Sequence, residues 1–516
     1  MRTTIGMKKK KTLTVFCTLI IGFMSSLHGA SQWAGSPGGN WDDNSNWNPG
    51  GFPNGQSAAA VFRLQPGTNQ VVDSSSDISI GQLYLDTPGN LDIHFTNHSL
   101  IFQTTNNSAL IAVSQGYPII DTSLTVNDKY LKISGNHSSN LWLKGDISGT
   151  GGLIFENGVI LFSGNNSYRK ETILLNTVLR ANGTGVIFPG TVSVSDGSQL
   201  FHDTSNNYSP HSFLYVVNNS YVDFGQTDQS LGSLMIIKGT VVGANATVNL
   251  TGSSHVIQVK SEAAIGIKNL ILSKGGYMQF SSVNGTFDGN MCKDSFMTMN
   301  LAGNQLNLDV HRHEAFSDFS MGFNNVIIHN GSVIKNGPGS VYFSGQLGSI
   351  PFLSIQTGNV YIGTALTDII DSSGELQVGE NGYLGGFGTL GRQGNAVVHN
   401  QGTVKPGTDS RIGTLKISGS YAQSSSGTLF IKALNKNAAD ELVIDENGVS
   451  LDGALFLQAQ TPDALHSGDQ IVILDNINAN TPITGKFSSF NSNLPSHLNA
   501  SVQYDSNQVK VLITQR

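Results

Sequence analysis

Charge and cysteine are both scarce in this sequence. Of its 516 residues, 28 are Lys or Arg and 35 are Asp or Glu, so charged residues make up 12% of the chain, about half of the usual share in globular proteins. Cysteine occurs twice, as Cys17 and Cys292. Cys17 lies in an N-terminal apolar stretch that is expected to be cleaved off, so only Cys292 would remain and an intramolecular disulfide is excluded. Core packing and backbone hydrogen bonds must then hold the fold.

Glycine and small polar residues take the place of the missing charges. There are 60 glycines, and Ser, Asn and Thr fill most of the other polar positions. These residues are poor helix formers, so long helices are excluded. The chain is nevertheless 38% hydrophobic, which is enough apolar material for a core and excludes wholesale disorder. The composition predicts a large all-β protein with many turns.

The first 30 residues have the pattern of a secretory signal peptide. Arg2 and Lys8 to Lys11 precede an apolar stretch from Leu13 to Met24, and small residues follow up to Ala30. An apolar stretch of about 12 residues is too short for a permanent membrane helix, although an N-terminal anchor is the alternative. Removing this segment, which holds five basic and no acidic residues, changes the net charge from −7 to −12. An acidic exported chain is not expected to bind nucleic acid.

Short β-strand patterns recur along the rest of the chain. Runs such as Val159 to Phe162 and Asn359 to Ile362 are followed by Gly, Asn, Ser or Asp, with turn signals every 6 to 12 residues or so. The same alternation of short strands and turns along the whole remaining chain favours a solenoid over a sandwich. Gly and Asn would form its corners, and uncharged Asn, Ser and Thr would stack in ladders between coils. We therefore expect a right-handed parallel β-helix.

Three segments carry a resemblance to a known family. Residues 331–345 read GSVIKNGPGSVYFSG, and related patterns lie at 145–168 and 379–444. In composition and order these segments resemble the passenger region of autotransporters, the exported part of type V secretion proteins, with its passenger-associated β-strand repeats. The resemblance implies a β-helix whose C-terminal coils are the stable end of a passenger.

The same resemblance implies a translocating β-barrel, and the sequence departs from it there. No barrel-sized set of amphipathic ten-residue strands follows Ile444. We expect release without a dedicated translocator, help from a separate outer-membrane partner, or descent from a truncated gene. The expected organisation is a signal peptide at 1–30, a Trp/Gly-rich N-terminal cap at 31–65, a β-helix with repeats at 66–375, and passenger-end coils at 376–516.

The N-terminal segment of the mature chain contains three tryptophans, Trp33, Trp41 and Trp47, among Gly, Asn and Asp. One interpretation is a cap, because the first coil of a solenoid would otherwise expose its core and its unpaired edge. The functional alternative is a binding surface on which sugars stack against the indole rings. We keep both interpretations for these three residues.

Other clusters with chemistry-bearing side chains are better explained as solvated turns. One contains two histidines that would share a strand face, another is acidic and could hold Ca²⁺ at a turn, and a third resembles an integrin-type tripeptide but fits the start of a repeat. Cys292 is expected to be a buried small hydrophobe. The three clusters are His311, His313 and Glu314; Asp440, Glu441, Asp445 and Glu446; and Lys144-Gly145-Asp146.

The sequence thus predicts an exported, non-enzymatic β-helical protein. It would be adhesin-like or envelope-structural, located at the cell surface, in the outer membrane, in the medium or in the periplasm, and it would need no cofactor or metal. Its expected partners are a host-cell or glycan receptor and a separate outer-membrane translocator. The alternative is a carbohydrate-binding or polysaccharide-degrading β-helix that uses Trp33 to Trp47 or a groove. Scattered single charges argue against the active site that a degrading enzyme would need.

Overall fold

The computed structural model describes two compact units, within Met1–Ser209 and Pro210–Arg516. In the described part of the chain, no helix is long and apolar enough to cross a membrane. Most of the predicted signal peptide (residues 1–28), Cys292, and the cluster of His311, His313 and Glu314 lie outside the described residues. The structure describes residues 29–516 except 50, 107–108, 137–138, 253–254, 261–263, 275, 282–287, 292–296, 311–319, 325, 346–347, 373, 462–463 and 478–480.

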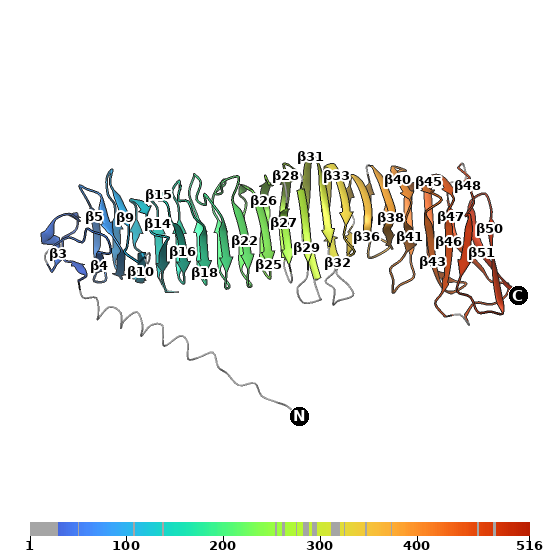
Figure 1. Cartoon of the computed structure of the whole chain (residues 1–516), viewed down its shortest axis with the longest axis horizontal. Helices are drawn as coiled ribbons and strands as arrows, with labels where there is room; N and C mark the ends of the chain where they lie inside the picture. The colour runs from blue at the N-terminus through green and yellow to red at the C-terminus, as the bar shows by residue number, and fades with distance from the viewer. Residues whose placement is uncertain are drawn as a thin grey trace, which may run out of the picture. The chain divides into compact units, whose positions relative to one another are not determined.

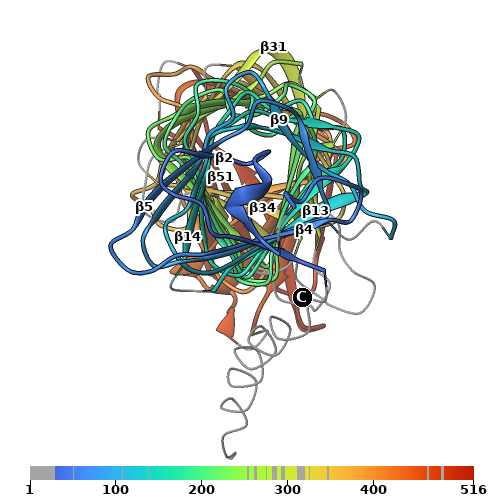
Figure 2. The same ribbon diagram turned by 90° about the vertical axis from the view of Figure 1, so that its left-hand side faces the viewer.

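Unit 1 is a parallel β-solenoid with three faces. In Figure 1 its coils follow one another from blue to green, and in the end-on view of Figure 2 its strands surround the interior. The first face contains β4 (Ala59–Arg63), β7 (Gln82–Thr87), β10 (Ala109–Gly116), β13 (Tyr130–Ser134), β16 (Gly152–Glu156), β18 (Thr172–Leu175) and β20 (Val192–Ser195).

The second and third faces of unit 1 are parallel in the same way. The second contains β5 (Asn69–Asp73), β8 (Asn90–Ile93), β11 (Ile119–Ile120), β14 (Asn140–Leu143), β17 (Val159–Phe162), β19 (Val178–Ala181) and β21 (Gln199–His202). The third contains β6 (Ile78–Ile80), β9 (Ser99–Phe102), β12 (Ser123–Val126) and β15 (Ile147–Gly149).

Alternation of side chains explains why these runs form strands of a solenoid. On β14, Leu141 and Leu143 are buried while Trp142 between them points outward. The parallel register places Leu143 beside Phe162 of the next coil, inside, and Trp142 beside Leu161, outside. Each coil therefore contributes apolar side chains to one continuous interior, and this burial stabilises the stack.

Asparagine ladders join the coils at their corners. Asn157 and Asn176 both adopt the left-handed conformation, with φ of 57° and 48°, which Asn accepts more readily than other non-glycine residues. The Nδ2 of Asn176 donates to Oδ1 of Asn157 at 2.8 Å, and Asn90 donates to Asn69 in the same way. The predicted ladders of uncharged polar residues are confirmed at these positions.

The N-terminal segment of unit 1 pairs with its first coil. β1 (Ser31–Trp33) is antiparallel to β3 (Trp47–Asn48) and parallel to β4, and β2 (Gly39–Asn40) is parallel to β5. The short 3₁₀ helix η1 (Asn44–Asn46) begins at Asp43, whose carboxylate accepts a hydrogen bond from the Ser45 N–H at 2.9 Å. An acidic side chain at this position satisfies a donor that the helix leaves free.

Unit 2 is also a parallel β-solenoid, but several of its strands continue around a corner. β26, for example, pairs with both β23 and β24 of the preceding coil. The strands are β22 (Phe213–Val217), β23 (Tyr221–Asp223), β24 (Asp228–Leu231), β25 (Ser233–Ile237), β26 (Thr240–Leu250), β27 (His255–Lys260), β28 (Ala264–Leu272), β29 (Gly276–Ser281), β30 (Asp288–Met291), β31 (Met297–Val310), β32 (Ser320–Asn324), β33 (Val326–Asn336), β34 (Ser340–Ser344), β35 (Gly348–Ile350), β36 (Phe352–Ile362), β37 (Ile369–Ser372), β38 (Glu375–Gly386), β39 (Thr389–Leu390), β40 (Ala396–Asn400), β41 (Thr403–Pro406), β42 (Thr414–Gln423), β43 (Thr428–Asn435), β44 (Ala438–Ala439), β45 (Glu441–Leu451), β46 (Ala454–Ala459), β47 (Gln470–Asn476), β48 (Ile483–Gly485), β49 (Ser489–Ser492), β50 (Leu498–Tyr504) and β51 (Gln508–Gln515).

The last coil of unit 2 departs from the parallel pattern. β51 is antiparallel to both β47 and β50, so a hairpin follows the parallel strands. The prediction of an all-β parallel β-helix is confirmed in each unit.

Lys335 of unit 2 is a fully buried charged residue at a corner of the solenoid. Its Nζ donates to the carbonyl oxygens of Asn336 and Gly337, both at 2.8 Å, and of Thr357 at 3.1 Å. Burial lowers the pKa of Lys335 to about 8, and the nearby carboxylate of Asp309 opposes this shift. The lysine of the repeat-like segment thus ties two successive corners together from the inside.

Candidate binding groove on unit 1

Trp33, Trp41 and Trp47 form a buried aromatic cluster. Their exposed fractions are 4%, 0% and 3%. Trp41 packs against Trp47 and Phe62, with ring centroids 4.8 Å and 5.5 Å apart, and against Phe95 at 5.7 Å. Burial of this kind leaves no accessible ring face in the cluster, which argues against stacking of sugars on these three tryptophans.

Hydrogen bonds fix two of the three tryptophans, whereas the buried Nε1 of Trp33 has no partner among the described residues. The Nε1 of Trp41 donates to the carbonyl oxygen of Pro53 at 3.1 Å, and the Nε1 of Trp47 donates to the carbonyl oxygen of Trp41 at 2.6 Å. Buried indole N–H groups need such partners. The arrangement is that of a packed interior.

The acidic cluster near β45 is divided between the interior and the surface. Asp440 is fully buried, 3.5 Å from the Nζ of Lys432, and accepts hydrogen bonds from the backbone N–H groups of Gly413 and Lys432, each at 2.9 Å. Burial raises the pKa of Asp440 to about 6. Asp445 pairs with Lys416 at 2.6 Å on the outer side. The structure thus gives Asp440 and Asp445 separate lysine partners and does not bring them together around one ion.

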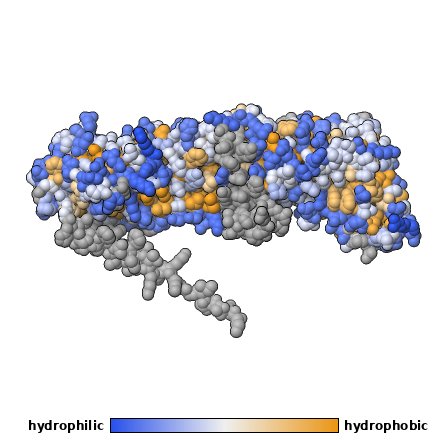
Figure 3. Space-filling view, in the orientation of Figure 1, coloured by the Kyte–Doolittle hydropathy of each residue, from blue (hydrophilic) through white to orange (hydrophobic). Residues whose placement is uncertain are grey.

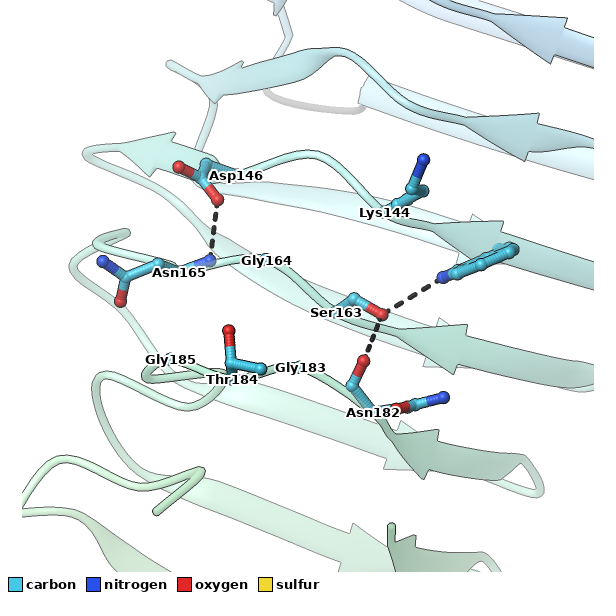
Figure 4. Close-up of a pocket in the computed structure, with 10 residues that line it drawn as sticks. Lys144, Asp146, Ser163, Gly164, Asn165, Asn182, Gly183, Thr184 and Gly185 are labelled. Carbon is cyan, nitrogen blue, oxygen red and sulfur yellow. Dashed lines mark hydrogen bonds between the residues drawn. The ribbon is translucent and has the colours of Figure 1, made fainter. Parts of the chain in front are cut away.

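A groove of about 550 Å³ opens on unit 1, at the corner that follows the second face (Figure 4). Three successive coils contribute to it, directly after the ends of β14, β17 and β19. The lining residues are Trp142, Lys144, Asp146, Ser163, Gly164, Asn165, Asn182, Gly183, Thr184 and Gly185.

Three glycines at equivalent corner positions let the backbones of successive coils approach closely beside the groove. Gly145, Gly164 and Gly183 are spaced 19 residues apart, and each stands between two polar residues. A Cβ on Gly145 would lie 2.0 Å from the carbonyl oxygen of Thr122, and one on Gly164 would lie 2.6 Å from that of Gly145. Gly164 also has a φ of +83°, which favours glycine. The corner therefore has no room for side chains, and it is formed by backbone.

The glycine column ends at a threonine on either side. The register of the second face aligns Thr122 with Gly145 and Thr204 with Gly183. The hydroxyl of Thr204 donates to the carbonyl oxygen of Gly183 at 2.6 Å. The glycine column is thus three coils long.

Polar side chains stand on both sides of this glycine column, in the two columns that Figure 4 shows. One consists of Lys144, Ser163 and Asn182, and the other of Asp146, Asn165 and Thr184. All of them except Ser163 are exposed.

The column of Asp146, Asn165 and Thr184 is held by backbone donors and keeps unused hydrogen-bonding capacity. Oδ1 of Asp146 accepts from the backbone N–H of Asn165 at 2.7 Å, and Oδ1 of Asn165 accepts from that of Val186 at 3.1 Å. Within the described part of the chain, no partner engages the second carboxylate oxygen of Asp146, the Nδ2 of Asn165, the hydroxyl of Thr184 or the side-chain amide of Asn182. These groups are available to a ligand.

Trp142 forms an aromatic wall of the groove, and its orientation is fixed. The ring is half-buried on the outer side of β14. Its Nε1 donates to Oγ of Ser163 at 3.1 Å, and this hydroxyl donates to the carbonyl oxygen of Asn182 at 2.7 Å. The indole is therefore attached to the same coils that supply the polar side chains.

Lys144 contributes a positive charge that is already paired. Its Nζ lies 5.8 Å from the centroid of the Trp142 ring and forms an ion pair with Asp121. The hydrogen bond to Asp121 raises the pKa of Lys144. Among the lining residues, one amine and one carboxylate stand beside neutral amides and hydroxyls, a set suited to hydrogen bonding with a hydroxyl-rich ligand.

Sequence reasoning missed Trp142 and treated Lys144-Gly145-Asp146 as a repeat start alone. A signal was present in the 19-residue spacing of three triplets that have glycine at their centre. They are Lys144-Gly145-Asp146, Ser163-Gly164-Asn165 and Asn182-Gly183-Thr184.

A scan of the chain against models of known protein families finds no match, and no curated protein matches it.

Proposed function

We propose that this protein is an exported, non-enzymatic β-helical protein, adhesin-like or envelope-structural, of the autotransporter passenger type. The parallel solenoid supports this proposal, because its outer faces offer long and regular surfaces to a partner. The segments with the passenger-like patterns form parts of coils, among them 331–345 with the buried Lys335. Its partners would be a host-cell or glycan receptor and a separate outer-membrane translocator.

Charged side chains on the outer faces of unit 1 pair with each other, which supports a binding surface made of uncharged groups. Ion pairs join successive coils, as between Lys132 and Glu156 at 2.5 Å and between Arg180 and Asp203. The charges in these pairs therefore already have a partner within the solenoid. Figure 3 shows hydrophilic and apolar side chains interspersed on the surface. A partner would therefore mainly meet hydroxyls, amides and apolar side chains.

A second candidate function is carbohydrate binding, and the groove at Trp142 is the observation that favours it. The groove places an aromatic ring beside available amide and hydroxyl groups, in contrast to the buried cluster of Trp33, Trp41 and Trp47. The two candidates are compatible, since an adhesin can recognise a glycan.

Fractionation of the native cell tests the proposed export. We expect an antibody against the chain to detect it at the cell surface or in the medium, and protease added to intact cells to degrade the surface-held fraction. A periplasmic marker protein serves as the control for leakage. Retention in the periplasm would contradict the adhesin-like function.

A further inference from the structure

We propose that the groove at Trp142 is a binding site for a short, uncharged oligosaccharide. This inference rests on the proposed adhesin-like function only for its biological role, since it names the ligand class.

The aromatic wall supplies the apolar half of sugar recognition. The C–H face of a sugar ring packs well against an indole, which combines a large apolar area with a polar N–H. Here the N–H of Trp142 is already bonded to Ser163, and Ser163 is bonded to the next coil. The ring is consequently held before the ligand arrives, which lowers the entropic cost of binding.

The unused polar groups supply the other half. Asp146 offers a carboxylate oxygen, Asn165 and Asn182 offer amide groups, and Thr184 offers a hydroxyl, all exposed at the groove. Sugar hydroxyls both donate and accept, so a mixture of acceptors and donors suits them better than a set of one kind. Recognition by a few placed polar groups beside an apolar wall is typical of small-ligand sites.

The length of the groove favours an oligosaccharide over a single sugar. Its polar side chains come from three successive coils, and strands of adjacent coils lie about 4.8 Å apart, so the first and third coils are about 10 Å apart. The side-chain columns run from coil to coil, as Figure 4 shows. A ligand lying along them would contact Asp146 and Thr184 at opposite ends.

The charge of the groove favours an uncharged glycan. Lys144 is paired with Asp121, whereas Asp146 faces the groove and has no basic partner among the residues that the structure describes. The chain without residues 1–30 has a net charge of −12. A sialic or uronic acid would bring a carboxylate close to Asp146 in an acidic protein, and like-charge juxtaposition disfavours such a ligand.

Glycan binding by the purified full chain tests the inference. On a glycan array with uncharged, sialylated and uronic-acid oligosaccharides, we expect retention of uncharged glycans. For the best uncharged glycan, calorimetry should show at least a tenfold loss of affinity in Trp142→Ala and a severalfold loss in Asn182→Ala. In matched controls, Tyr117→Ala, an exposed aromatic outside the groove, and Thr150→Ala should leave the affinity unchanged.

A blocking variant covers the case in which Trp142→Ala fails to fold. Thr184→Tyr places a large side chain on the exposed rim of the groove without removing a core contact, so its circular dichroism should be unchanged and its affinity at least tenfold lower. Full affinity in a folded Thr184→Tyr variant, stronger binding of acidic glycans, or no glycan binding at all would overturn the inference.

The outcomes separate this inference from the proposed export and adhesion. Glycan binding that Trp142→Ala abolishes, in a chain retained in the periplasm, would support the groove and contradict the adhesin. Surface location without glycan binding would support the adhesin and contradict the groove as a glycan site. Binding of a peptide instead of a glycan, at a site that includes Lys144 and Asp146, would overturn the carbohydrate assignment.

Discussion

Trp41 and Trp142 are the same residue type in opposite environments. Trp41 has no exposed surface and packs among other rings, whereas Trp142 is half-buried on the outer side of a strand and lines a groove. Both indole N–H groups are hydrogen-bonded, one to a backbone carbonyl and the other to a hydroxyl. The direction of the side chain, inward or outward, thus separates the packing role of Trp41 from the proposed binding role of Trp142.

For Trp142 that direction follows from strand alternation. Leu141 and Leu143 occupy the inward positions of β14, so the residue between them must point outward. Trp41, in contrast, lies in a turn directly after the short strand β2. Its burial depends on contacts with residues 6 to 54 positions away, such as Trp47 and Phe95.

The largest effect is expected for Trp41→Ala. Removing a fully buried aromatic side chain costs about 3–5 kcal/mol in free energy of unfolding, here in the coils that β1 to β5 form. Hydrogen exchange of the amides in these strands should show the loss. Trp142→Ala is the matched control and should lower the free energy of unfolding by no more than about 1 kcal/mol. Equal effects would break the comparison.

Lys335 is a charged residue whose side chain points inward, as that of Trp41 does. The next largest expected effect is the pH dependence of stability that this buried lysine causes. Its pKa is about 8 in the folded state against an ordinary 10.5, so between these values the unfolded chain binds more protons. Stability should therefore rise with pH over this window, by an amount on the order of 3 kcal/mol, and should be unaffected by this group below about pH 8.

Urea unfolding at pH 7.5, 9 and 10.5 measures this dependence. In Lys335→Met the rise that Lys335 causes should disappear, whereas Lys268→Met, at an exposed position of β28, should retain it. The same pH profile in the wild type and in Lys335→Met would show that the buried amine does not control it.

Gly164→Ala tests whether the column of Gly145, Gly164 and Gly183 beside the groove requires glycine. The added Cβ meets the carbonyl oxygen of Gly145 at 2.6 Å and the residue has a positive φ, so we expect a loss of about 2 kcal/mol. Gly197→Ala separates the two causes, because Gly197 has a φ of +76° with no atom within 4 Å of its Cβ. It should lose only about 1 kcal/mol. Equal losses in thermal or urea unfolding would show that the contact does not matter.

Ser163→Ala gives the smallest expected effect and sharpens the role of Trp142. The variant removes the hydroxyl that orients the indole and that donates to Asn182. One such hydrogen bond is worth about 1 kcal/mol, so glycan affinity should fall severalfold while the fold is retained. Ser167→Ala, at an exposed serine beyond the groove, should bind normally. Unchanged affinity in Ser163→Ala would contradict pre-orientation of the ring.

Composition and strand texture sufficed to predict the parallel solenoid, because uncharged corners and apolar alternation are local properties. Pairs such as Asn157 with Asn176 could be expected in kind for the same reason. The groove was missed although the 19-residue spacing of residues 144, 163 and 182 was a signal for it, because only the structure shows that this spacing equals one coil and aligns their side chains. The burial of Trp33, Trp41 and Trp47 could not be decided either, because ring exposure depends on how the chain closes around Phe62.

Because Gly145, Gly164 and Gly183 are spaced 19 residues apart, one coil apart in the structure, the length of the groove is a whole number of coils. Each coil adds one glycine to the column and one polar side chain to either side of it. A tandem duplication of residues 145–163 would keep the alternation of inward apolar side chains and lengthen the groove by one coil, about 4.8 Å. The size of the proposed ligand could therefore change in whole steps, through copying of a short stretch of gene, without any redesign of the interior.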